Sequence, residues 1–88
     1  MPTIKITKRA VEAIPFPKDG QVLYRDAELT GFGVLVGSQV KTFFAEGQIR
    51  RRTVRMALGR YPLIQPEEAR RLALDRLAAM RIPTMSPV

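Results

Sequence analysis

Cysteine, histidine and tryptophan are absent from this 88-residue chain. The lack of cysteine and histidine excludes a disulfide scaffold, a zinc finger, a Cys or His nucleophile and histidine-based acid–base catalysis. No apolar run approaches the roughly 18 residues that span a bilayer, and the N-terminus lacks the hydrophobic stretch of a secretion signal. These absences predict a soluble cytoplasmic protein with no cofactor, no metal ion and no membrane partner.

Acidic residues are scarce relative to basic ones. The chain has 15 Lys and Arg against 8 Asp and Glu, which gives a formal charge of +7. Residues 41–60 hold six basic residues and one acid, so this segment alone carries +5. A concentrated basic segment in a small domain is typical of a nucleic-acid-binding surface, and the plainer alternative is a solvated charged face.

The length limits the chain to one small domain with a thin hydrophobic core. Apolar residues make up 45% of the sequence, which is ordinary for a globular protein and too high for a disordered one. We expect residues 1–82 to form the domain. Residues 83–88, which include two prolines, are expected to begin a linker.

Two segments are predicted to be helical. The hydroxyl of Thr7 can cap a short helix over residues 8–13, which the prolines that follow bring to an end. A longer helix is expected over residues 66–81, because Pro66 suits a first turn and the two glutamates after it favour the positive end of the helix dipole. The apolar stripe of this helix must cover another surface; it consists of Ala69, Leu72, Ala73, Leu77 and Met80.

Three strands are predicted between the two helices. Residues 31–36 are rich in β-branched and apolar side chains, residues 41–45 begin a second strand, and residues 53–58 alternate between apolar and other side chains. Residues 22–25 could add a short strand. Short connections favour an antiparallel meander. The predicted fold is therefore α+β: a three-stranded antiparallel sheet packed against a C-terminal helix, with a short N-terminal helix.

The third predicted strand has two distinct sides because side chains alternate with a period of two. Its apolar set, expected beneath the long helix, is Val54, Met56 and Leu58. Thr53 and Arg55 must then point to the uncovered side of the sheet. The chain reversal before this strand lies either near Gly47 or within residues 49–51, and equal strand lengths favour the second position.

An uncovered sheet side with arginine and threonine suits DNA. A major groove about 12 Å wide admits a two-stranded ribbon, in which Arg pairs with guanine and Thr contacts a thymine methyl group. The alternative is that these arginines only protect a sheet edge against aggregation. We expect Arg51, Thr53 and Arg55 to contact bases or the groove. The expected flanking contacts are Lys41, Gln48, Arg50 and Arg52.

Other conspicuous residues have structural explanations. Asp26 and Glu28 have no histidine and no third acid nearby to complete a metal site. Phe43 and Phe44 have opposite parity in their strand, so one belongs to the core. The other is expected at the sheet rim, and contact with a nucleotide is the alternative. The arginines of the long helix are expected to be exposed or paired with acids of the same helix.

Four motifs in order carry a family resemblance. They are Ile6-Thr7, Asp26-x-x-Leu29-Thr30-Gly31-Phe32-Gly33-Val34-x-Val36, Leu58-Gly59-Arg60-Tyr61-Pro62 and Glu68-Ala69-Arg70. Over residues 6–82 the chain resembles the N-terminal arm-type DNA-binding domain of tyrosine recombinases, the integrases of phages and genomic islands. The resemblance implies a three-stranded sheet that enters the major groove. Family members commonly have Asn-Gly at the hairpin, where this chain has Arg50-Arg51.

The resemblance also implies a function. It indicates sequence-specific binding of double-stranded DNA at arm-type attachment sites, in support of the integration and excision of a mobile element. The family's catalytic arginines, histidines and nucleophilic tyrosine belong to another domain, so this chain is expected to have no catalytic residues and to be no enzyme by itself. Its parent would be a tyrosine recombinase of the bacterial cytoplasm or nucleoid, with other integrase protomers as partners and no small-molecule ligand.

Two other functions stay open from the residues alone. An RNA-binding module would display aromatic side chains on its sheet for base stacking, whereas the third strand displays Thr and Arg. A protein-interaction domain would use an exposed strip on the long helix that includes Leu74 and Ala78.

Overall fold

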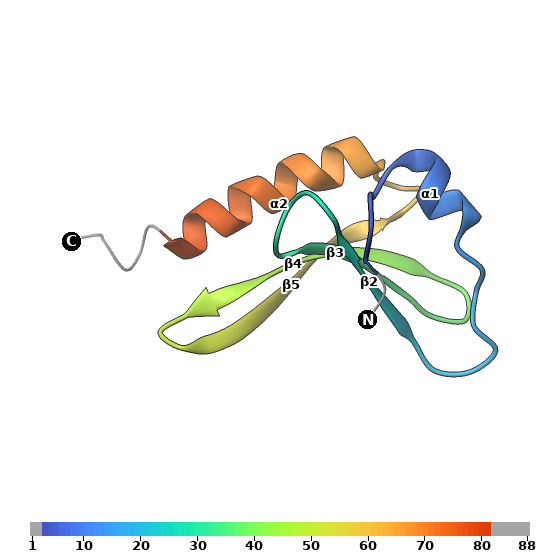
Figure 1. The fold of residues 1–88 in the computed structure, drawn as a ribbon, viewed down its shortest axis with the longest axis horizontal. Coiled ribbons are helices and arrows are strands. Elements are labelled where there is room, and N and C mark those ends of the chain that lie inside the picture. The colour runs from blue at the N-terminus through green and yellow to red at the C-terminus, as the bar shows by residue number, and fades with distance from the viewer. Residues whose placement is uncertain (1–2, 82–88) are drawn as a thin grey trace.

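The computed structural model describes residues 3–81, and the predicted linker at residues 83–88 lies outside this range. Two helices pack on one side of a twisted sheet (Figure 1). The elements, in chain order, are β1 (Thr3–Ile4), α1 (Lys8–Ala13), β2 (Val22–Asp26), β3 (Phe32–Val36), β4 (Lys41–Ile49), β5 (Arg52–Tyr61) and α2 (Pro66–Arg81). Within this range no helix is long and apolar enough to cross a membrane.

The sheet has five strands in the order β1-β2-β3-β4-β5. β1 pairs with β2 in parallel, and every other neighbouring pair is antiparallel. The α+β class and the antiparallel β3-β4-β5 meander are confirmed, whereas the predicted number of three strands is wrong. The possible short strand over residues 22–25 is confirmed as β2. β1 was not predicted, because two residues are too few to show a period.

Both helices have the predicted bounds. The Oγ1 atom of Thr7 accepts a hydrogen bond of 3.1 Å from the amide of Ala10, which caps α1. α1 then buries Val11 against the sheet. Local signals, a capping hydroxyl and the prolines, are enough to fix these ends.

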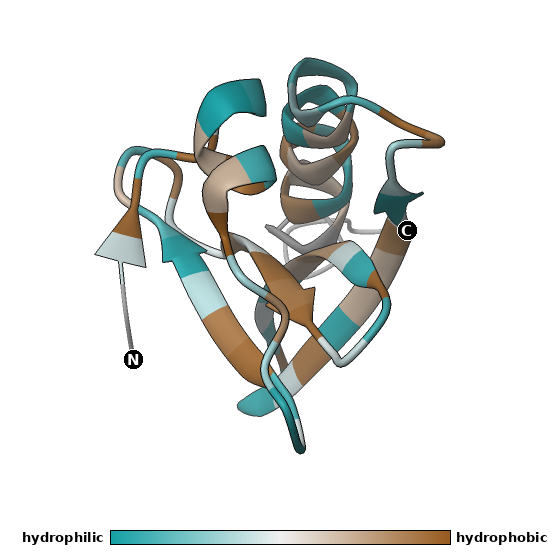
Figure 2. Cartoon of the chain, turned by 90° about the vertical axis from the view of Figure 1, so that its right-hand side faces the viewer, coloured by the Kyte–Doolittle hydropathy of each residue, from teal (hydrophilic) through white to brown (hydrophobic). Residues whose placement is uncertain are grey.

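The core lies between the helices and the central strands. Figure 2 shows both helices above the sheet, with hydrophobic segments in the strands beneath them. Alternate residues of β3 and β4 face the helices, and α2 contributes two small buried residues at helical spacing, Ala69 and Ala73. The strand residues buried in this core are Phe32, Val34, Val36, Phe43 and Ala45.

The apolar residues of β5 lie on the predicted side of the sheet, but they are not the main partner of α2. Met56 pairs with the buried Ala45, which places it on the helix side, and Leu58 packs against the core. Val54 and Met56 are only partly buried, because β5 is an edge strand and its hairpin with β4 projects beyond the other strands (Figure 1).

The hairpin between β4 and β5 closes with a two-residue turn. Ile49 pairs with Arg52, so Arg50 and Arg51 form the loop, as equal strand lengths predict. Both loop residues have positive φ, 50° and 70°. Two consecutive left-handed residues match the twist of a hairpin, although Asn-Gly is the usual pair because most side chains are strained there.

Candidate nucleic-acid interface

The side of the sheet opposite α2 carries the polar residues of the hairpin, and we call it the open face. Phe43 and Ala45 face the core, so the alternating residues of β4 point the other way. The register places Glu46 opposite Arg55 and Gln48 opposite Thr53. The residues that define the open face are Arg25, Phe44, Glu46, Gln48, Thr53 and Arg55.

An aromatic ring forms the floor of the open face. Phe44 is 2% exposed, and its ring lies over Gly33 of the neighbouring strand, where a Cβ atom would meet ring carbons. The guanidinium carbon of Arg55 lies 5.2 Å from the centroid of the same ring. Of the two adjacent phenylalanines, Phe43 lies in the core, which confirms the prediction that one of them would. Phe44 is buried on the open face, and not at the sheet rim as expected.

On the open face, Glu46 of β4 links Arg25 of β2 to Arg55 of β5. Its Oε1 lies 2.7 Å from Nη1 of Arg25, and its Oε2 accepts hydrogen bonds from Nε and Nη2 of Arg55, at 3.1 and 2.9 Å. The Glu46 side chain is 13% exposed and the two arginine side chains are 36% and 43% exposed. Burial raises the pKa of Glu46, but the two guanidinium groups outweigh burial and lower the pKa below its ordinary value.

The end of the hairpin carries three exposed arginines, Arg50, Arg51 and Arg52, which we call the turn arginines. None of them forms an ion pair with an acid among residues 3–81. Their guanidinium groups can therefore meet a partner. The projection of the hairpin places them at one end of the open face (Figure 1).

Lys41 does not belong to this surface, contrary to its expected place beside the DNA contacts. It shares the parity of Phe43, is 6% exposed, and its Nζ donates a 2.6 Å hydrogen bond to the carbonyl oxygen of Val11. The Nζ also lies 4.8 Å from the centroid of the Phe16 ring. Burial lowers the pKa of Lys41. Lys41 thus fastens α1 to the sheet, and we leave it out of the interface.

The structure brings six of the seven sequence-predicted site residues to the hairpin, on the open face or at the turn: Gln48, Arg50, Arg51, Arg52, Thr53 and Arg55. Sequence reasoning missed Arg25 and Glu46. Period two from the core residues of β4 would have placed Glu46 on the open face. Nothing local to Arg25 shows that it reaches Glu46, because that contact depends on the register of three strands.

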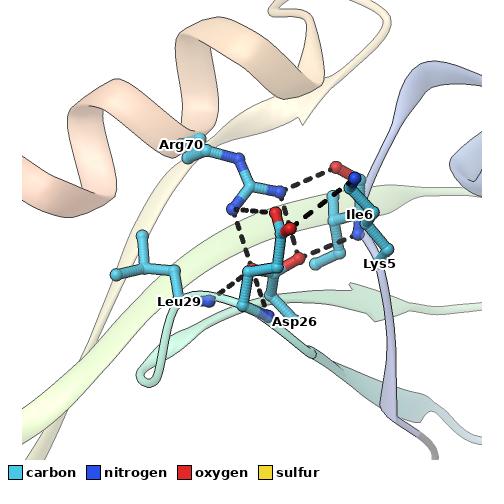
Figure 3. Close-up of polar contacts among 6 residues, drawn as sticks. Lys5, Ile6, Asp26, Leu29 and Arg70 are labelled. Carbon is cyan, nitrogen blue, oxygen red and sulfur yellow. Dashed lines mark hydrogen bonds and ion pairs between the residues drawn. The ribbon is translucent and has the colours of Figure 1, made fainter.

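A second charged cluster lies on the helix side and has a structural role (Figure 3). The buried carboxylate of Asp26 accepts hydrogen bonds from the amides of Ile6 and Leu29, at 2.8 and 2.6 Å, and from both terminal nitrogens of Arg70. Arg70 therefore pairs with β2, and the prediction that it is exposed or paired within its own helix is wrong. No group of acids in residues 3–81 is arranged to hold a metal ion.

The chain is a small α+β domain that presents arginines on an open sheet face and on a projecting hairpin, an arrangement typical of DNA-binding domains. The family model of the Arm DNA-binding domain matches residues 6–82. The chain belongs to this family, the arm-type DNA-binding domains of integrases, and it binds DNA. No curated protein and no solved structure matches the chain significantly.

Proposed function

We propose that the domain binds double-stranded arm-type DNA with the open face and the turn arginines, and that the β4-β5 ribbon lies in the major groove. The observation that carries this proposal is the position of Arg55 and Thr53 on the side of the sheet that neither α1 nor α2 covers. A two-stranded ribbon fits a groove about 12 Å wide. The groove-facing residues are Gln48, Arg51, Thr53 and Arg55, and Arg50 and Arg52 flank them.

Arg55 is suited to base contact. Its guanidinium has five N–H donors, of which Nε and one Nη2 hydrogen are bonded to Glu46. The remaining donors can pair with the O6 and N7 atoms of guanine, and the neighbouring hydroxyl of Thr53 can bond a base or contact a thymine methyl group.

The turn arginines are suited to phosphate contact. They are exposed at the end of the ribbon, and a cation without a fixed partner can follow the DNA backbone without regard to sequence. Each phosphate neutralised releases counterions, so the logarithm of affinity falls with the logarithm of salt by about 0.9 per contact.

Duplex DNA fits this face better than single-stranded RNA does. Sheets that bind RNA stack bases on exposed aromatic rings. Phe44, the aromatic residue of the open face, is 2% exposed and lies beneath Arg55. A base therefore meets a guanidinium group and not a free ring.

The domain is proposed to act without chemistry of its own, with residues 1–82 as the binding unit of a tyrosine recombinase. In this role it directs the recombinase to attachment DNA in the bacterial cytoplasm, and other integrase protomers are its partners in the assembly. Membership of the arm domain family supports this assignment, since such domains are typical of tyrosine integrases.

The proposal is tested by mobility shift with a duplex that the 88-residue chain enriches from a randomised DNA library. Arg55→Ala is expected to weaken binding of that duplex by about 1–3 kcal/mol. Arg71→Ala is the matched control, because Arg71 is an exposed arginine on α2, on the covered side of the sheet. Equal affinities for Arg55→Ala and the parent, or stronger binding of single-stranded RNA than of duplex DNA, would contradict the proposal.

A further inference from the structure

An acid at the centre of a DNA-binding surface calls for an explanation. Glu46 is the one acidic residue of the basic segment 41–60. It repels phosphates and removes one unit of the charge that attracts DNA of any sequence. Its carboxylate nevertheless lies between two guanidinium groups of the open face, 2.7 Å from Arg25 and 2.9 Å from Arg55.

We propose that Glu46 is a positioning residue for sequence discrimination: it holds Arg25 and Arg55 in the orientation in which they meet base edges. This proposal rests on the assignment of the open face to DNA. It adds two residues, Arg25 and Glu46, to the recognition surface, and it assigns Glu46 a role in specificity and not in affinity.

The geometry supports a fixed orientation of Arg55. The Phe44 ring lies below its guanidinium group, and Oε2 of Glu46 accepts two hydrogen bonds along one edge of that group. The planar fork is therefore held from below and along one edge, and the donors that remain point away from the carboxylate. A bidentate contact to guanine needs such a fixed plane, and a side chain that is already ordered loses less rotamer entropy on binding.

The turn arginines provide the contrast within the same surface. They form no ion pair among residues 3–81, while both arginines of the Glu46 cluster are paired. Fixed guanidinium groups suit base edges, whose positions depend on sequence, and unpaired ones suit phosphates. The proposed interface thus combines an ordered centre on the open face, which contacts bases, with the turn arginines beside it, which contact phosphates.

The test compares two affinities of the same protein. Glu46→Gln removes the charge with little change in size, and its affinity is measured for the library-enriched duplex and for a duplex of shuffled sequence. Affinity for the shuffled duplex is expected to rise because a repulsive charge is removed. The ratio of the two affinities is expected to fall about tenfold, which is the effect of losing a well-oriented base contact.

Two further variants separate positioning from charge and from folding. Glu67→Gln makes the same charge change on an exposed site of α2, and it should leave the affinity ratio unchanged. In the Arg55→Ala background, Glu46→Gln should lower the ratio less than it does alone, because the part of its effect that passes through Arg55 is already lost. Thermal unfolding of each variant shows whether it is folded at the assay temperature.

The outcomes distinguish this inference from the proposed function. If Glu46→Gln changes both affinities by the same factor, or if its effect on the ratio is fully additive with Arg55→Ala, the positioning role is overturned and the DNA-binding face stands. If Arg55→Ala leaves binding unchanged, or if no duplex is enriched, the face itself is wrong. If the Glu46→Gln variant is unfolded, Arg25→Lys replaces it in the test, because lysine keeps the positive charge but lacks the planar guanidinium group. An unchanged ratio of the two affinities in Arg25→Lys would overturn the inference.

Discussion

The carboxylate of Asp26 and the guanidinium of Arg70 meet as a two-pronged pair, with Nη1 2.8 Å from Oδ2 and Nη2 3.1 Å from Oδ1. Arg70 also donates to the carbonyl oxygen of Ile6 at 3.0 Å and lies over the ring of Phe32. This one contact joins α2, β2 and the segment that leads into α1 (Figure 3). It helps to hold α2 on one side of the sheet, and neither α1 nor α2 covers the opposite side (Figure 1).

Loss of this pair should destabilise the domain. Asp26→Asn removes the charge that Arg70 and three backbone amides share, and breaking a buried pair of this kind costs about 3 kcal/mol or more. Urea unfolding followed by circular dichroism measures the change in free energy of unfolding. The control is Glu28→Gln, because the Glu28 side chain is 57% exposed and lies 3.9 Å from Arg70, so it should change stability by no more than about 0.5 kcal/mol. Equal losses for the two variants would refute the structural role of the pair.

Acid should unfold the domain through the same carboxylate. Burial raises the pKa of Asp26, but hydrogen bonds from Arg70 and from backbone amides outweigh burial, and its pKa in the folded state lies below the ordinary value. A lowered pKa contributes stability that is complete above the unfolded pKa of about 4 and is lost as the pH falls through the folded pKa. The free energy of unfolding is therefore expected to be flat near neutrality and to fall below about pH 4.

The same titration has an internal control. In Asp26→Asn the fall below about pH 4 should be shallower, because one of the groups that must take up a proton is gone. Glu46 also has a lowered pKa, because burial raises it but the two arginines outweigh burial. Protonation of Glu46 should therefore leave a smaller fall in stability with pH in the Asp26→Asn variant. Parallel curves for the variant and the parent would show that Asp26 does not drive acid unfolding.

Local sequence signals account for the parts of this fold that could be predicted, and distant contacts account for the rest. Capping and proline signals indicated both helices, and alternation indicated the sides of β5. Arg70 pairs with a residue 44 positions away, which no local pattern reveals. Lys41 is different, because side chains alternate along a strand and Lys41 shares the side of Phe43, which is the core side. Its expected place beside the DNA contacts took account of its charge and not of this alternation.

Gly33 marks the place where the open face needs the smallest side chain. A Cβ atom there would meet the Phe44 ring and the carbonyl oxygen of Tyr24. Gly33→Ala should lower the free energy of unfolding by about 1–3 kcal/mol, the usual cost of overpacking. It should also weaken DNA binding, since displacement of Phe44 removes the support of Arg55. Gly37→Ala is the control, because its Cβ would find its nearest neighbour, the Val40 carbonyl oxygen, at 3.8 Å. A stable, fully binding Gly33→Ala variant would contradict this role of the ring.

The hairpin turn should show a conflict between stability and binding. Arg50 and Arg51 both occupy left-handed backbone conformations, with φ of 50° and 70°, where a non-glycine residue costs about 1–2 kcal/mol. Replacement of the pair by Asn-Gly should therefore raise the free energy of unfolding by about 1–2 kcal/mol, since this pair adopts such a turn readily. The same change removes two of the turn arginines.

Binding by the Asn-Gly variant should weaken for enriched and shuffled duplexes alike. The slope of affinity against salt should also become less steep by about 0.9 for each phosphate that is no longer neutralised, which a titration at several salt concentrations measures. Replacement of both arginines by lysine is the matched control: it keeps the charge and the backbone strain, so it should keep the salt slope and gain no stability. If the Asn-Gly variant is more stable than the parent and its affinity has the same dependence on salt, these two arginines do not contact DNA. If the Asn-Gly variant gains stability and has the shallower salt slope, while the double-lysine variant has neither change, the two arginines occupy the strained turn because their side chains contact phosphates.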